Sequence, residues 1–335
     1  MKVYVCGGTG FIGYQVCLQL LEKGHEVSSI SLGDVELGSW WPKDKIKTKI
    51  GDLFTMEADE LVEMFTGYDA MVYAVGPDDR YTPKAPAYKF FYDRLVLACA
   101  KVVKAARDAG VKKCAICNSY FAYFDRIRPD EHLAEKHPYI RCRVEQAQKC
   151  IEIGGDKMAV YIMELPYIFG VHPVRAPIWK DLFIKRLLKM KPYIFFFKGG
   201  TNMITVNHVA EAIVGAILNG RSSKRYTIGD KNLTWVEWIS LMLPEMGIDR
   251  KIKILPPFLG TLFAKRMKRI EAKKGLEPGL DLDHLFKDIQ CRETYFDPTS
   301  SQEELGYTGG ELEEAIKETV KKCMELINDE PQINS

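Results

Sequence analysis

The sequence predicts an α/β fold in which helices cover both faces of a doubly wound parallel sheet. In the first half of the chain, short β-rich segments alternate with helical segments, which is the pattern of consecutive βαβ units. The segment DAMVYAVG at 69–76 is almost continuously apolar, as expected of a strand that is buried on both faces. The chain also opens with a strand, a glycine-rich turn and a helix in direct succession.

The first thirteen residues, MKVYVCGGTGFIG, carry the most specific signal. A β-rich run at 3–5 is followed by Gly7, Gly10 and Gly13 at the spacing G-x-x-G-x-x-G, and then by an apolar helical pattern. Gly7 allows the tight turn, Gly10 lets a pyrophosphate approach the backbone, and Gly13 lets helix and strand pack closely. Free N–H groups and the dipole at the helix start favour phosphate groups. This context predicts a dinucleotide-binding Rossmann domain, with an ordinary glycine-rich turn as the alternative.

The other elements of the predicted sheet follow in order along the chain. Strands are expected within 24–31, 45–53, 69–76, 111–119, 157–163 and 225–230, and helices at 59–65, 90–109, 139–153, 179–190, 206–220, 233–246, 255–274 and 311–327. We expect residues 1–170, with 201–230 returning to them, to form the NAD(P)-binding Rossmann domain. Residues 171–200 and 231–335 are expected to form a smaller, mostly helical, substrate-binding region at the C-terminal side.

The composition is that of an ordinary soluble protein. The 335 residues are 47% hydrophobic and 27% charged, and the net charge of +2 gives no indication of nucleic-acid binding. No apolar run approaches the about eighteen residues that span a bilayer, and no signal peptide is visible. Nine cysteines in this context favour reduced thiols in the cytoplasm. We expect no metal site, because Cys114 and Cys117 would face opposite sides of a strand and the six histidines lack ligand spacing.

The order and spacing of further segments resemble the extended short-chain dehydrogenase/reductase superfamily, of the NAD-dependent epimerase/dehydratase type. The likeness covers nearly the whole chain and implies an NAD(P)-dependent enzyme. The segments that carry it are GGTGFIG at 7–13, GDL at 51–53, DAMVYAVG at 69–76, AARDAGVKKCAICNS at 105–119, LPYIFG at 165–170, VNHVAEAI at 206–213, YTIGD at 226–230 and FDPTSSQEELGY at 296–307.

The resemblance implies three catalytic residues. The catalytic Ser or Thr of the family matches Ser119, and its Y-x-x-x-K motif matches Tyr139 and Arg143, which share one helix face. In the family the tyrosine moves a proton at a carbonyl or alcohol oxygen, the serine hydrogen-bonds that oxygen, and the lysine binds the nicotinamide ribose. Arginine keeps the positive charge that a phenol of pKa about 10 needs to act as a base, but it does not release a proton.

The end of the second strand bears on the choice between NAD and NADP. Members that bind NAD carry Asp or Glu where this chain has Ser31, while Asp34 follows three residues later and no arginine follows directly. The missing carboxylate removes repulsion against a 2′-phosphate, which slightly favours NADP. The residues implied in cofactor binding are Gly7, Thr9, Gly10, Phe11, Ile12, Gly13, Ser31, Asp34, Asp52, Leu53, Ala74, Val75, Gly76, Asn118, Tyr139, Arg143, Pro166 and Tyr167.

The expected substrate residues are Ser119, Tyr120, Phe121 and Tyr167. The residues from Tyr120 to Phe124 directly follow Ser119 and are the best candidates for a pocket wall. Sugar-nucleotide members often carry Arg-x-x-Asn where this chain has Glu164 and Tyr167. These departures favour a small, fairly apolar, non-nucleotide substrate.

The main prediction is therefore an NAD(P)-dependent oxidoreductase acting on a carbonyl or alcohol, with Tyr139 as the acid/base. One alternative is a catalytically degenerate NAD(P)-binding sensor or scaffold, in which Arg143 is only a solvated charge; another is a sugar epimerase or dehydratase. The segment at 255–274 begins apolar and ends basic, so it would either cover the substrate pocket or associate peripherally with a membrane, without stable insertion. The sequence is compatible with a homodimer.

Overall fold

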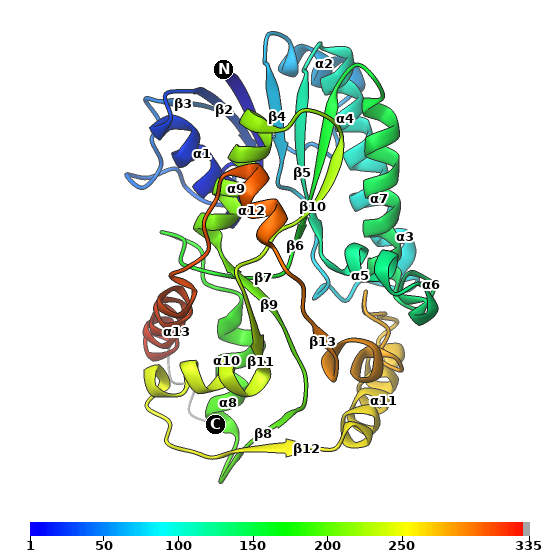
Figure 1. Cartoon of the computed structure of the whole chain (residues 1–335), viewed down its shortest axis with the longest axis vertical. Coiled ribbons are helices and arrows are strands. Elements are labelled where there is room, and N and C mark those ends of the chain that lie inside the picture. The colour runs from blue at the N-terminus through cyan, green and yellow to red at the C-terminus, as the bar shows by residue number, and fades with distance from the viewer. Residues whose placement is uncertain (331–335) are drawn as a thin grey trace.

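The computed structural model describes residues 1–330 and contains the predicted parallel sheet. Its seven strands lie in the order β10-β6-β5-β4-β1-β2-β3, and every neighbouring pair is parallel (Figure 1). The strand order reverses between β1 and β4, as in a doubly wound sheet. The strands are β1 (Lys2–Cys6), β2 (Glu26–Ser31), β3 (Ile46–Ile50), β4 (Ala70–Tyr73), β5 (Lys113–Ser119), β6 (Ala159–Leu165) and β10 (Lys224–Thr227).

Helices cover both faces of this sheet, and each face has its own apolar core. Val3 and Val5 of β1 pack in one core with α1 and α9, whereas Tyr4 and Cys6 pack in the other with α2, α4 and α7. Alternate side chains of a strand point to opposite faces, so a strand covered on both sides must be apolar throughout. The helices are α1 (Phe11–Glu22), α2 (Ala58–Phe65), α3 (Ala87–Phe91), α4 (Ala98–Asp108), α7 (Pro138–Gly154) and α9 (Val206–Asn219).

The rest of the chain forms a second region that is mostly helical, as the sequence predicted, and that also contains short strands. Strand β9 lies between β11 and β13 and also pairs with β7, and β8 pairs with β12 in a separate ribbon. Within LPYIFG, residues 167–169 thus form strand β7, and β9 belongs to this second sheet, while α9 and β10 return to the main sheet. The strands are β7 (Tyr167–Phe169), β8 (Ile194–Phe197), β9 (Gly200–Thr205), β11 (Lys231–Thr234), β12 (Ile252–Leu255) and β13 (Glu293–Thr294).

An aromatic core holds the second region together. Phe169, Trp179, Trp235 and Trp238 pack on one another, with the Phe169 and Trp179 rings stacked at 4.6 Å between centroids. Several aromatic residues of this part of the chain therefore serve packing first. The remaining helices are α5 (Phe121–Ile127), α6 (Leu133–Lys136), α8 (Lys185–Lys189), α10 (Trp235–Met242), α11 (Pro257–Lys273), α12 (Thr299–Leu305) and α13 (Leu312–Asn328).

The nine cysteines are all free thiols. Cys114 packs in the core on one face of the sheet and Cys117 against the core on the other, as the strand prediction required. Within residues 1–330, no helix combines the length and the apolar character needed to cross a bilayer. In the same part of the chain, no three His, Cys, Asp or Glu side chains gather as a metal site would require.

Candidate active site

A cavity of about 860 Å³ lies along the carboxyl ends of the main strands, where the strand order reverses. Ligands of doubly wound sheets bind at this position. The structure brings together in its walls every residue that was implied in catalysis, cofactor binding or substrate binding, except Gly13. Those in the wall are Gly7, Thr9, Gly10, Phe11, Ile12, Ser31, Asp34, Asp52, Leu53, Ala74, Val75, Gly76, Asn118, Ser119, Tyr120, Phe121, Tyr139, Arg143, Pro166 and Tyr167.

The three glycines of the first turn meet different surroundings. Gly7 has a φ of +86°, and a Cβ there would lie 2.7 Å from the Ala74 carbonyl oxygen. Gly13 does not line the cavity but lies under the turn. A Cβ there would come within 2.1 Å of the Gly7 oxygen, so only glycine fits. A Cβ on Gly10 would meet only that same oxygen, at 3.1 Å, and Gly10 lines the cavity. Gly7 and Gly13 are thus required by the fold, whereas Gly10 leaves room for a ligand.

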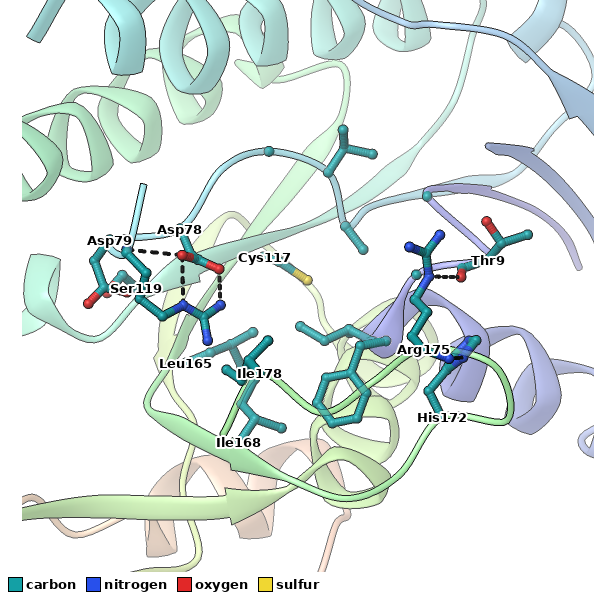
Figure 2. A pocket seen from close by; sticks show the side chains of 18 of the residues that line it. Thr9, Asp78, Asp79, Cys117, Ser119, Leu165, Ile168, His172, Arg175 and Ile178 are labelled. Atoms are coloured by element: carbon teal, nitrogen blue, oxygen red, sulfur yellow. Dashed lines mark hydrogen bonds and ion pairs between the residues drawn. The ribbon is translucent and has the colours of Figure 1, made fainter. Parts of the chain in front are cut away.

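The polar groups near the end of β2 are already partnered. The Ser31 hydroxyl accepts a hydrogen bond from the Thr9 N–H at 3.2 Å. Arg175 donates twice to the Asp34 carboxylate, at 2.8 and 2.9 Å. Its Nε also donates to the Thr9 carbonyl oxygen at 2.9 Å, a contact shown in Figure 2. The hydrogen bonds and the charge of Arg175 lower the Asp34 pKa.

Arg175 is a residue that the sequence did not indicate for this site. It reaches the end of β2 from the loop after β7, far along the chain from Asp34. His172 shapes this loop, since its Nδ1 accepts hydrogen bonds from the Val174 and Arg175 N–H groups. Burial, with the nearby Arg175 charge, lowers the His172 pKa to about 4, so the ring is neutral at physiological pH. His172 is therefore a hydrogen-bonded loop residue, in agreement with its missing ligand spacing.

Tyr139 and Arg143 form a direct pair on α7. Arg143 donates from Nε to the Tyr139 hydroxyl oxygen at 2.9 Å, and its guanidinium lies 5.1 Å from the centre of the tyrosine ring. Its other nitrogens donate to the carbonyl oxygens of Cys117 and Pro77 and to the Gln146 side chain, at 2.9–3.3 Å. Arg143 is only 7% exposed. The structure thus contradicts the interpretation of Arg143 as a solvated charge.

The surroundings of Tyr139 act on its pKa in opposite directions. Burial raises the pKa most, and the Asp79 charge adds to this effect; the Arg143 charge and hydrogen bonding from Arg143 and Ser119 lower it. The net shift is upward, so the phenol keeps its proton at neutral pH. The Tyr139 N–H donates to the Gly279 carbonyl oxygen at 2.9 Å, and the ring meets Phe91 edge-on. These contacts hold the hydroxyl in one place.

Ser119 lies at the end of β5, where Asn118 ties the strand to α7. The Asn118 side chain accepts from the Ser119 N–H at 2.7 Å and donates to the Arg143 carbonyl oxygen and to Gln146, both at 3.0 Å. Gln146 thus contacts both Asn118 and Arg143. Gln146 was not among the expected site residues, although its spacing of three residues from Arg143 places both on one helix face.

The segment after β4 brings charged groups to the same end of the cavity. Asp78, Asp79 and Arg80 all line the cavity, although they were not among the expected site residues, and Arg80 pairs with Asp78. Figure 2 shows Asp78 and Asp79 beside Ser119, opposite the end that holds Thr9, His172 and Arg175. Burial raises the Asp79 pKa to about 6, against the influence of the Arg143 charge. The sequence signal that could have indicated these residues is a run of charged side chains soon after the buried strand β4.

The remaining wall near Ser119 is mostly aromatic and aliphatic. Tyr120, Phe121 and Tyr167 lie here as expected, whereas Tyr123 and Phe124 do not line the cavity. The second region adds Ile178, Trp179 and Leu182. Phe121 begins helix α5, which the sequence analysis did not predict. The Tyr120 hydroxyl accepts a hydrogen bond from Thr201 at 3.0 Å, which fixes its ring against the second sheet.

Glu164 is structural and does not line the cavity. It is fully buried and accepts two hydrogen bonds from Arg126, at 2.8 and 2.9 Å. A buried carboxylate needs such a partner, because an isolated buried charge is strongly unfavourable. The position that often carries arginine in sugar-nucleotide members therefore supports the fold in this chain.

Comparison with known proteins agrees with this architecture. The model of the NAD dependent epimerase/dehydratase family matches residues 3–229. The chain is 21% identical to the Synechocystis protein named "Putative dihydroflavonol 4-reductase", over 95% of this chain and 93% of that protein. It is 24% identical to a UDP-glucose 4-epimerase of Bacillus subtilis, over 83% of this chain and 94% of the epimerase. The crystal structure of UDP-glucose 4-epimerase from Bifidobacterium longum in complex with NAD+ and UDP superposes with a TM-score of 0.69 at 16% identity, covering 97% and 98% of the two chains. The chain belongs to the NAD-dependent epimerase/dehydratase family.

Proposed function

We propose that the protein is an NAD(P)-dependent oxidoreductase that acts on a carbonyl or alcohol of a small, fairly apolar, non-nucleotide substrate. The observation that carries the proposal is the 2.9 Å hydrogen bond from Arg143 to the Tyr139 hydroxyl, inside the cavity that also holds the glycine turn. A buried phenol acts in proton transfer at neutral pH only if its anion is stabilised. Arg143 supplies that stabilisation without lysine.

The residues present fit a nicotinamide dinucleotide. Gly10 leaves room at the start of α1, and the first N–H groups of a helix suit a pyrophosphate. Ser31, Asp34, Asp52 and Leu53 all line the cavity, and Ser31 and Asp34 would hold the adenosine ribose while Asp52 and Leu53 would contact the adenine. When bound, the dinucleotide supplies or accepts a hydride at the substrate carbon.

Tyr139 would handle the proton at the substrate oxygen. In carbonyl reduction its hydroxyl donates the proton to the oxygen that becomes an alcohol, and the phenolate that remains is stabilised by Arg143. In alcohol oxidation the Tyr139 phenolate accepts the proton of the substrate hydroxyl group, which becomes the carbonyl. Ser119 would hydrogen-bond the same oxygen. Because arginine does not release its proton, the phenolate is reprotonated from water instead of through the residue at position 143.

The walls of the cavity support the substrate class. Tyr120, Phe121 and Trp179 offer apolar surface, while Asp79 offers one carboxyl that changes its charge near pH 6. The similarity to UDP-glucose 4-epimerases keeps a sugar epimerase as a second candidate. The test is steady-state turnover of NAD(P)(H) with aldehydes, ketones and secondary alcohols, and with UDP-glucose as the nucleotide-sugar probe. Turnover of the simple carbonyls or alcohols supports the proposal, and epimerisation of UDP-glucose alone contradicts it.

The preference between NADP and NAD should depend on Ser31. We expect Ser31→Asp to shift the affinity ratio toward NAD by at least about tenfold, because a second carboxylate repels a 2′-phosphate but accepts from a ribose hydroxyl. Arg175 is already neutralised by Asp34 and cannot offset the added charge. The measurement is the dissociation constant of each cofactor. Ser39→Asp adds the same charge on an exposed residue outside the cavity and serves as control. An unchanged ratio in Ser31→Asp would show that Ser31 does not face the ribose.

The charge of Arg143 should set the pH dependence of turnover. Arg143→Met removes a cation and a hydrogen bond that lower the Tyr139 pKa, so that pKa rises further. Alcohol oxidation needs the phenolate, so its rate should fall about 100-fold at neutral pH and its optimum should move upward. Arg143→Lys should keep most of the activity. The control is Arg141→Met, on the same helix but exposed and paired with Glu145, and it should leave the pH profile unchanged. If Arg143→Met also left the pH profile unchanged, the Tyr139–Arg143 pair would be excluded from the mechanism.

A further inference from the structure

Large apolar side chains are exposed together on helix α11. Phe258, Leu262 and Phe263 are 61%, 60% and 58% exposed, and Leu259 of the same helix is also exposed. Ile254 of the neighbouring strand β12 is exposed as well. The spacing of i and i+4 places Phe258 with Leu262, and Leu259 with Phe263, on one side of the helix. The helix buries only Gly260 and Ala264. Figure 1 shows α11 and β12 at the end of the molecule remote from β1–β3.

Basic side chains surround these apolar residues. Residues 250–274 contain nine lysines and arginines and a single acidic residue, Glu271. Because the whole chain has a net charge of +2, the rest of the protein is net negative. Lys268 pairs with Asp281 and Asp283, whereas Lys265 and Arg266 form no ion pair within residues 1–330. The positive charge is thus concentrated beside the exposed apolar surface.

The structure contradicts one of the two expectations for this segment. None of residues 257–273 lines the cavity, so α11 does not cover the substrate pocket. The following residues do return to the active site, where Gly279 accepts the hydrogen bond of the Tyr139 N–H. The apolar side chains of α11 therefore need an explanation outside the catalytic site.

We propose that Ile254, Phe258, Leu259, Leu262, Phe263, Lys265 and Arg266 form a membrane-docking face that binds the surface of bilayers containing anionic phospholipids. The apolar residues at the start of α11 enter the boundary between headgroups and acyl chains, and the following basic residues contact the phosphate and carboxylate groups of the lipids. Peripheral helices bind membranes through this combination of apolar burial and attraction to anionic lipids. The docking leaves the protein on the membrane surface, since α11 is neither long nor apolar enough to cross it.

Charge complementarity favours a lipid surface over a second copy of the chain. A twofold contact through this face would place the two strongly positive segments 250–274 against each other, and like charges on facing surfaces oppose association. An anionic bilayer neutralises the same residues. The negative charge of the rest of the protein also directs this end toward the membrane.

The test is co-sedimentation of the whole protein with vesicles of phosphatidylcholine alone and of phosphatidylcholine mixed with phosphatidylserine. We expect binding only to the mixed vesicles, and weaker binding at high salt. The double variant Phe258→Ser/Phe263→Ser should lose affinity on the order of a hundredfold through lost apolar burial. Lys265→Glu/Arg266→Glu should lose about tenfold or more.

Matched controls separate this face from general surface changes. Ile127→Ser removes an exposed apolar side chain on α5, and Lys43→Glu/Lys45→Glu reverses two exposed charges in the loop before β3; both should bind vesicles as the wild type does. Cofactor titration should be unchanged in all variants, which shows that each is folded. The proposal is overturned if the wild type ignores phosphatidylserine vesicles, or if Phe258→Ser/Phe263→Ser still binds them. A wild-type dimer that ignores vesicles and becomes monomeric in that variant would assign the face to self-association instead.

Discussion

Tyr139→Phe should lower turnover by about 100- to 10,000-fold on any carbonyl or alcohol that the wild type converts. The substitution removes only the hydroxyl that Arg143 contacts at 2.9 Å, and it keeps the ring that packs against Phe91. The cofactor should still bind, because the glycine turn is untouched. The measurement is steady-state turnover with one substrate identified in the panel, together with the dissociation constant of the cofactor.

Tyr123 on helix α5 offers a matched control. Tyr123→Phe makes the same chemical change on α5, where the ring stacks with Arg126 outside the cavity, and should leave turnover unchanged. Equal rates for wild type, Tyr139→Phe and Tyr123→Phe would remove Tyr139 from the mechanism. The degenerate sensor or scaffold would then explain the cavity better, since it needs cofactor binding but no acid/base.

Gly10→Val should abolish NAD(P) binding while the protein stays folded. A Cβ at Gly10 approaches only the Gly7 oxygen, at 3.1 Å, so the added side chain extends into the cavity where a pyrophosphate would lie. The measurements are cofactor titration and thermal unfolding. Gly38→Val, which adds the same side chain outside the cavity, should titrate normally. Gly13→Val should instead fail to fold, since its Cβ would lie 2.1 Å from the Gly7 oxygen. An unchanged titration of Gly10→Val would contradict the assignment of the turn.

The sequence predicted the parts of the structure that depend on local pattern. The alternation of strands and helices, the apolar run of β4 and the glycine spacing each follow from neighbouring residues, and all led to the observed sheet. Tyr139 and Arg143 share a helix face because they are four residues apart, so their pairing could be expected. The nature of that pairing, with Arg143 buried and held by three further acceptors, could not be.

What the sequence did not reveal depends on contacts between distant segments. Arg175 reaches Asp34 across 141 residues, and no local pattern links them. The short strand β7 is a strand because β9 supplies its hydrogen-bonding partner, so it resembles a loop in isolation. Asp79 stands in a loop whose path into the cavity depends on the packing around it, and its raised pKa follows from burial.

The most direct test of the proposed chemistry is a crystal structure of the protein with NAD or NADP bound, because it needs no knowledge of the substrate. We expect the pyrophosphate against Gly10, the nicotinamide ribose within hydrogen-bonding distance of Tyr139 or Arg143, and the reactive C4 carbon facing the space between Tyr139 and the wall of Tyr120, Phe121 and Tyr167. A nicotinamide that turns away from Tyr139, or a dinucleotide bound with its C4 carbon blocked by protein, would contradict the assignment of this cavity to hydride transfer.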